Sequence, residues 1–107
     1  MHKEKLPLIH PGEILLEEYM KPLNISQNRL GRDLGIPAQR INAIIHAKRG
    51  ITTDTALRLA EYFKVSPQFW LNLQTQYELR KAKVDRTAER IRRQVRPLDV
   101  GLDAVGS

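Results

Sequence analysis

Helix-boundary residues divide this chain into short stretches, and strand patterns are hard to find between them. Pro11, the Ser66-Pro67 pair and Pro97 mark places where helices begin or end, because proline suits the first turn of a helix and interrupts its interior. Between these marks, apolar residues recur at the three- and four-residue intervals of an amphipathic helix. The spacing therefore predicts an all-α fold built from short helices.

Five helices are expected. The first opens at Pro11 and is interrupted by Pro22 and Asn24; the second covers residues 27–34, with an N-cap at residue 26; the third runs from residue 37 to about 47. The fourth follows a cap at residue 52 or 53, and the fifth runs from residue 67 toward Pro97, with a break expected between Lys81 and Asp85. The apolar arc of the first helix comprises Leu15, Leu16, Tyr19, Met20 and Leu23.

The second and third helices meet at Gly35 in a helix-turn-helix pattern. Gly31 has no side chain beyond hydrogen and allows close approach of the next helix, while Gly35 can take the left-handed conformation of a sharp turn. The angle between the helices is filled by Leu30, Leu34, Ile36, Ile41 and Ile44. This arrangement at residues 26–47 resembles the lambda-repressor-like class of five-helix DNA-binding domains. Similar helix pairs occur in proteins that never contact DNA, so the motif alone leaves the function open.

Length and composition exclude several classes of function. A chain of 107 residues with 41% hydrophobic residues buries enough surface for one small domain but not for an enclosed substrate cavity, so we expect no enzyme, no small-molecule substrate and no cofactor. The chain has no cysteine, which excludes disulfides and thiolate zinc ligands. His2 and His10 have no partners at metal-ligand spacing, so no metal is expected.

The positive charge is concentrated in the helix-turn-helix. The chain has a net charge of +6, and residues 21–50 hold six basic residues against one acidic residue, a net +5. The total charge does not distinguish nucleic acid from a membrane surface or an acidic protein. Its coincidence with a recognition-type helix favours DNA.

Groove chemistry assigns roles to the polar residues of this segment. Gln39 suits adenine, Arg40 suits guanine and Ala38 suits a thymine methyl, whereas Asn42 suits either a base or a phosphate. The predicted base-reading set is Ala38, Gln39, Arg40, Asn42 and Ala43. The predicted phosphate set is Ser26, Gln27, Arg29, His46, Lys48 and Arg49; simple exposure on a polar face is the alternative for Asn42 and His46.

Apolar residues of the fifth helix point to self-association. Phe69 and Trp70 suit either the core or a subunit interface. Leu71 and Leu79 lie off the main apolar arc, at angles that expose them in a monomer. We therefore expect a homodimer interface at Trp70, Leu71 and Leu79, with isolated surface leucines as the alternative.

A longer series of residues identifies a family. The segments His10-Pro11-Gly12-Glu13, Ile25-Ser26-Gln27, Arg40-Ile41-Asn42, the run from Gly50 to Leu59 and the run from Ser66 to Gln74 closely resemble the HigA family of antitoxins. The similarity covers roughly residues 8–98, most of the chain.

The resemblance implies a type II toxin–antitoxin system. HigA proteins are homodimers that neutralise HigB, a RelE-like mRNA endonuclease, and repress their own operon at palindromic operators. Such a toxin is expected to be basic, so the acidic face of the first helix, Glu13, Glu17 and Glu18, is the predicted toxin contact, with an ordinary solvated face as the alternative. The basic segments 80–83 and 90–96 depart from the family, which puts a toxin contact by the C-terminal helix in doubt; they add phosphate attraction or support dimerisation.

The chain is thus expected to comprise an N-terminal arm (1–9), a repressor-like domain (10–83) and a C-terminal helical extension with a frayed tail (84–107). The apolar stretch Leu6–Ile9 is too short for a signal peptide, and no run approaches the roughly 18 residues of a membrane span, so a cytoplasmic protein is expected. A stand-alone repressor without a toxin and a protein-interaction module without DNA binding remain the two alternatives.

Overall fold

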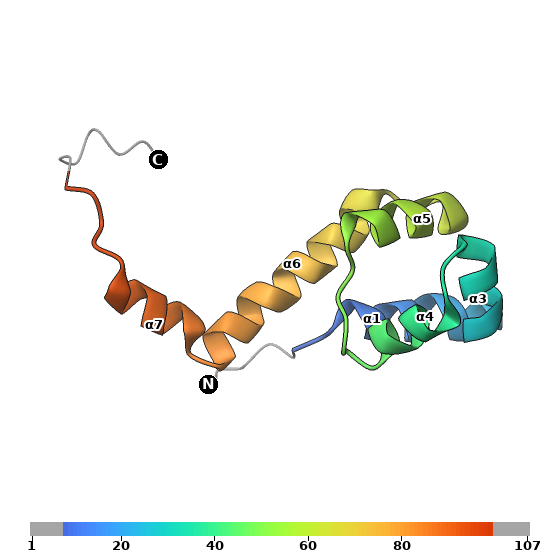
Figure 1. The fold of residues 1–107 in the computed structure, drawn as a ribbon, viewed down its shortest axis with the longest axis horizontal. Helices are drawn as coiled ribbons and strands as arrows, with labels where there is room; N and C mark the ends of the chain where they lie inside the picture. The colour runs from blue at the N-terminus through green and yellow to red at the C-terminus, as the bar shows by residue number, and fades with distance from the viewer. Residues whose placement is uncertain (1–7, 100–107) are drawn as a thin grey trace.

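The computed structural model describes residues 8–99, and these residues form helices joined by short turns (Figure 1). In chain order the segments are α1 (Pro11–Ile14), η1 (Leu15–Met20), α2 (Lys21–Leu23), α3 (Gln27–Leu34), α4 (Ala38–Ile45), α5 (Thr53–Phe63), α6 (Pro67–Val84) and α7 (Thr87–Gln94). Residues 8–99 contain no strand, so the prediction of an all-helical fold is confirmed for this part of the chain. The segments α1, η1 and α2 follow one another directly, so five helices precede α7.

The first helix departs from the expected periodicity at η1, which is π-helical. The Lys21 N–H donates to the carbonyl of Leu16, five residues earlier, so each turn here takes more residues than in an α-helix. This change of phase turns both Leu15 and Met20 inward, where they are buried. It turns Leu23 outward at 57% exposure, so the prediction that Leu23 belongs to the buried arc is wrong.

The α3–α4 corner forms as the glycines predict. The Ser26 hydroxyl accepts a hydrogen bond from the Arg29 N–H at 3.0 Å and caps α3. Gly35 ends α3 with φ 77°, in the left-handed region. A Cβ on Gly31 would lie 2.8 Å from the Ile36 carbonyl oxygen, so only glycine allows this approach. The apolar residues predicted to fill the corner are all buried: Leu30, Leu34, Ile36, Ile41 and Ile44.

Trp70 on α6 is the centre of the aromatic core. Its ring centroid lies 5.0 Å from those of both Tyr19 and Phe69, and 6.4 Å from that of Phe63. This enclosure leaves Trp70 with 0% exposure. Trp70 is therefore a core residue of its own chain, and the expectation that it offers surface to a subunit interface is corrected on this point.

The distal half of α6 and all of α7 extend away from the body formed by the other helices (Figure 1). Asp85 ends α6, and Arg86 follows with φ 68°, which confirms the expected break at the end of α6. None of the residues of α7 is buried. Within residues 8–99, every helix lacks the length or the continuous apolar character of a membrane-spanning segment. Residues 1–7 of the predicted arm (1–9) and residues 100–107 of the predicted extension and tail (84–107) lie outside the described residues.

Candidate nucleic-acid interface

The outward face of α4 carries polar side chains, as the sequence predicts. Ile41 and Ile44 are fully buried and fix α4 against the core. Gln39 and Asn42 are exposed, and Ala43 beside them is half-buried. Their three- and four-residue spacing puts these three residues on one face of the helix. Residues predicted to read bases therefore share a surface, with the half-buried Ala38 and Arg40 at its N-terminal end.

A side-chain hydrogen bond joins this face to the start of α3. The Asn42 Nδ2 donates to the Gln27 Oε1 at 3.1 Å, and Gln27 is the first residue of α3. Sequence reasoning assigned both residues to DNA contacts but did not find the bond between them. Since the two positions are 15 residues apart, no local spacing signals it. The bond fixes the orientation of the Asn42 amide relative to the N-terminus of α3.

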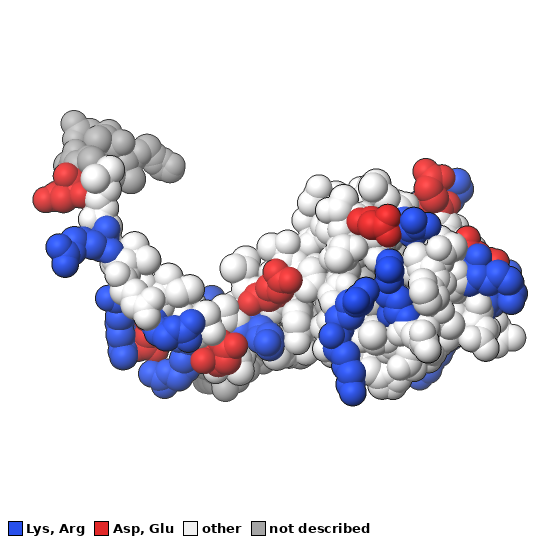
Figure 2. All heavy atoms as spheres, in the orientation of Figure 1, with Lys and Arg blue, Asp and Glu red and all other residues white. Residues whose placement is uncertain are grey.

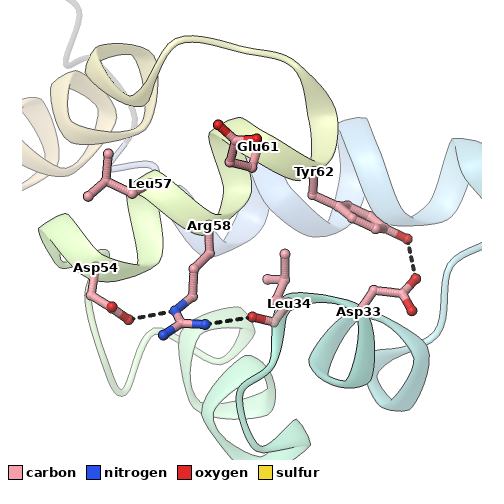
Figure 3. A pocket seen from close by; sticks show the side chains of 7 residues that line it. All are labelled: Asp33, Leu34, Asp54, Leu57, Arg58, Glu61 and Tyr62. Atoms are coloured by element: carbon pink, nitrogen blue, oxygen red, sulfur yellow. Dashed lines mark hydrogen bonds and ion pairs between the residues drawn. The ribbon is translucent and has the colours of Figure 1, made fainter.

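Arg40 faces a carboxylate on α5. Its Nη1 lies 3.8 Å from the Asp54 Oδ2, and the same oxygen accepts a hydrogen bond from the Arg58 Nε at 2.9 Å. The Arg58 Nη1 also donates to the Leu34 carbonyl at 2.8 Å, as Figure 3 shows. The hydrogen bond from Arg58, together with the charges of Arg58 and Arg40, holds the pKa of Asp54 below its ordinary value. The four-residue spacing of Asp54 and Arg58 signals their pair, but nothing local signals Arg40.

Arg29 pairs with Asp33 on α3, the carboxylate that Tyr62 of α5 also contacts. Its Nε lies 3.5 Å from the Asp33 Oδ2, and the Tyr62 hydroxyl donates to the same oxygen at 2.7 Å. This hydroxyl, with Arg29 beside it, lowers the pKa of Asp33, and Asp33 in turn raises that of Tyr62. The two helices border an open hollow of about 500 Å³ (Figure 3), lined by Asp33, Leu34, Asp54, Leu57, Arg58, Glu61 and Tyr62.

The turn after α4 presents a second basic group. His46, Lys48 and Arg49 are exposed, and Ala47 at φ 61° directs the chain back after the helix. Neither Lys48 nor Arg49 takes part in an ion pair within the described residues. Figure 2 shows Lys and Arg side chains around α4 and again along the end of α6 and α7. The unpaired side chains of Lys48 and Arg49 suit phosphate better than the paired Arg29 does.

His10 caps the first helix and packs against Tyr77, so its role is structural. Its Nδ1 accepts a hydrogen bond from the Gly12 N–H at 2.9 Å and caps α1, while its ring meets the edge of Tyr77 at 4.7 Å between centroids. Burial lowers the pKa of the imidazole. Among residues 8–99, no three His, Asp or Glu side chains are grouped to hold a metal ion.

The residues predicted to contact proteins lie apart from α4 in sequence and element. Glu13, Glu17 and Glu18 are exposed on the first helix, and Glu17 accepts a hydrogen bond from the Lys21 Nζ at 2.8 Å. On α6, Leu71 is half-buried against the core, whereas Leu79 is 62% exposed. Of the predicted dimer residues, Leu79 therefore offers the most free apolar surface.

Two helices crossing at Gly31 and Gly35, the second with a polar face turned outward, define a helix-turn-helix domain, and a family model described as helix-turn-helix matches residues 16–70. Known proteins resolve the family further. The chain is 51% identical to virulence-associated protein I of Dichelobacter nodosus over 84 residues, 78% of either chain. It is 29% identical to antitoxin HigA-1 of Vibrio cholerae over 79 residues, 74% of either chain.

Solved structures agree with the sequence relatives. The Pseudomonas aeruginosa antitoxin HigA with the higBA promoter is 41% identical with a TM-score of 0.79, over 86% of this chain and 99% of that one. The antitoxin GraA in complex with its operator is 38% identical with a TM-score of 0.80, over 94% of this chain and 100% of that one. The chain belongs to the HigA family of helix-turn-helix proteins, which confirms the resemblance seen in its sequence.

Proposed function

We propose that this chain is an antitoxin that represses its own operon by binding operator DNA and that neutralises a HigB-type mRNA endonuclease. The observation that carries the DNA-binding part is the polar outward face of α4, which Ile41 and Ile44 hold in place. Two solved relatives support it: HigA from Pseudomonas aeruginosa was solved with the higBA promoter, and GraA was solved in complex with its operator.

In this proposal α4 lies in the major groove with its N-terminal residues nearest the bases, as in lambda-repressor-like domains. Gln39 pairs with adenine and Arg40 with guanine, each bidentate pair discriminating by about 1–3 kcal/mol. Ala38 and Ala43 leave room for a thymine methyl. Asn42 presents its amide at an angle set by Gln27, which suits a base edge near the centre of the contact.

Phosphate contacts set the position of the domain on the duplex. The free N–H groups at the start of α3, beside Ser26 and Gln27, face a phosphate as helix N-termini do. His46, Lys48 and Arg49 add contacts from the turn after α4. Arg29 adds less than these, because Asp33 already neutralises part of its charge.

A homodimer presents two copies of α4 to successive major grooves. A palindromic operator requires the two recognition helices to be about 34–36 Å apart. We assign the contact between copies to the exposed side of α6, with Leu79 and the edge of Leu71, since Leu79 is 62% exposed and the distal half of α6 extends away from the body that contains α4 (Figure 1). Such a dimer binds two half-sites and leaves the reading surface uncovered. The reading surface is the outward face of α4 with the residues predicted to read bases: Ala38, Gln39, Arg40, Asn42 and Ala43.

For the toxin, the proposal uses the acidic face of the first helix. Glu13, Glu17 and Glu18 attract a basic endonuclease, which is the charge expected of a protein that binds RNA. Glu17 contributes less, because Lys21 is already bound to it.

The DNA-binding part is tested by fluorescence anisotropy. A labelled duplex from the region upstream of the gene is compared with a shuffled duplex of the same length and composition. We expect the upstream duplex to bind at least about 10³-fold more tightly at physiological salt. Equal affinity for the two duplexes would contradict operator recognition and favour the interaction-module alternative.

The antitoxin part is tested by expressing the chain together with the small protein encoded beside it. We expect the two proteins to elute together and the neighbouring protein to cleave mRNA only when the chain is absent. Triple substitution of Glu13, Glu17 and Glu18 by Gln is expected to weaken co-elution and leave operator affinity intact. Separate elution of the wild-type pair would favour the stand-alone repressor.

A further inference from the structure

Three charged groups form a chain of contacts that ends on the reading surface. The Arg58 guanidinium is fixed at two points, by the Leu34 carbonyl at 2.8 Å and by the Asp54 carboxylate at 2.9 Å (Figure 3). Because Arg58 holds it, the Asp54 Oδ2 has a fixed position from which it attracts Arg40, whose Nη1 lies 3.8 Å away. The side chain predicted to read guanine is thus oriented before any DNA is bound.

An arginine without such a partner has two competing uses on DNA. Its long side chain samples many rotamers, and its guanidinium binds a phosphate as readily as a guanine edge. A fixed carboxylate restricts these rotamers. Its negative charge also repels the phosphate backbone, whereas the guanine O6 and N7 acceptors remain available to the other side of the guanidinium fork.

From this geometry we infer that Asp54 is a positioning residue that sets the sequence preference of the domain by acting through Arg40. The inference rests on the proposed operator binding and adds to it a residue that reads no base itself. Asp54 also lies in the first turn of α5, where an acidic residue stabilises any helix. A purely structural role of that kind changes stability and leaves base preference as it was, so the test must measure preference.

The test compares Asp54→Asn with the wild type on the upstream duplex and on the shuffled duplex, over a range of salt concentrations. Asparagine keeps the shape of the side chain, and the α5 cap comes from Thr52, so the fold is expected to persist. We expect the ratio of the two affinities to fall about five- to tenfold. Affinity for the shuffled duplex is expected to rise, and its log–log salt slope to steepen by about 0.9, because Arg40 becomes free to bind a phosphate.

Glu61→Gln is the matched control, since it removes the same charge from the same helix. The Glu61 carboxylate lies 3.9 Å from the Lys64 Nζ and forms no ion pair with Arg40 or Arg58 within residues 8–99. We expect its affinity ratio to equal that of the wild type. A fall as large as that of Asp54→Asn would overturn the inference in favour of general charge repulsion.

The double variant Arg40→Ala/Asp54→Asn completes a thermodynamic cycle. In the Arg40→Ala background, Asp54→Asn is expected to change the ratio by less than about twofold. A full additional fall, or an unchanged ratio in Asp54→Asn alone, overturns the inference and leaves operator binding standing. Absence of any preference in the wild type overturns both the inference and the proposed function.

Discussion

Side chains on and beside α4 differ in what binds them before DNA arrives. Arg40 and Asn42 are already held, by Asp54 and Gln27 respectively, whereas Lys48 and Arg49 have no ion-pair partner in the described part of the chain. Held side chains suit base reading, because less conformational freedom is lost on binding. Free cations suit phosphates, whose position varies little with sequence.

Lys48→Ala and Arg49→Ala are therefore expected to weaken binding to every duplex by a similar factor. Each lost phosphate contact is expected to lower the log–log salt slope by about 0.9. Anisotropy titrations of the upstream and shuffled duplexes at several salt concentrations measure both effects. A slope equal to that of the wild type would remove the residue from the phosphate set.

His10 makes stability depend on pH. Its Nδ1 must be unprotonated to accept the Gly12 N–H, and burial holds its folded-state pKa below the ordinary value of 6.5. The unfolded chain then binds the proton more readily than the folded chain does, so the stabilisation is complete above about pH 6.5 and is lost as the pH falls through the folded-state pKa. Unfolding by urea at about pH 7.5 and about pH 5 measures the difference.

The control for this measurement is His10→Asn, which keeps an acceptor at the N-cap and does not titrate in the range. Its free energy of unfolding is expected to change less between the two pH values than that of the wild type. Equal pH dependence of the two proteins would show that another group is responsible.

At the scale of elements, two glycines determine how helices approach. The sequence predicts the Gly31 contact because it falls inside a recognisable motif, and it predicts the caps because capping is local to a few residues. The packing of α1 on α4 was not predicted. A Cβ on Gly12 would overlap the Ile44 carbonyl oxygen, a contact between residues far apart in the chain, and the π-helical η1 likewise has no local signature.

Gly12→Ala is expected to destabilise the fold by about 2–3 kcal/mol, because the added methyl meets backbone that can yield only if α1 shifts. Gly50→Ala is the comparison: its nearest atoms all belong to the Gln74 side chain, which can rotate away at the expense of its hydrogen bond to the Ile51 N–H, a loss of about 1 kcal/mol. Chemical denaturation of both variants measures the loss in the free energy of unfolding for each. Equal losses would contradict the close approach of α1 and α4.

At the scale of the whole molecule, the body formed by the packed helices differs from the α6–α7 extension in what it buries and what it exposes. The body contains the core and the face of α4 that we propose reads DNA, and the extension leaves apolar side chains exposed on Leu79, Val84, Ile91 and Val95. Charge and motif allowed the polar outward face of α4 to be predicted, because it lies within one contiguous segment; that this face reads bases stays a prediction. Of the three residues predicted at a dimer interface, Trp70 lies in the core instead, because apolar periodicity does not distinguish a residue facing its own chain from one facing a second copy.

Leu79→Asp is expected to convert a dimer into a folded monomer, because a charge is placed in the proposed contact while no core residue is lost. Leu23→Asp is the matched control, since Leu23 is exposed to a similar degree, 57% against 62%, but lies on α2. Molar mass from light scattering after size-exclusion chromatography distinguishes the two variants. A molar mass for Leu79→Asp equal to that of the wild type would contradict the assignment of Leu79 to the dimer interface.

The central claim, that α4 reads operator sequence, is tested most directly by the affinity ratio of upstream to shuffled duplex for Gln39→Ala and Arg40→Ala. Both residues lie outside the fully buried core, so circular dichroism should show a wild-type fold. We predict that each variant loses about tenfold or more of the ratio, which corresponds to the 1–3 kcal/mol of one bidentate base contact. A wild-type ratio in both variants, with the fold intact, would contradict the assignment of α4 to the major groove.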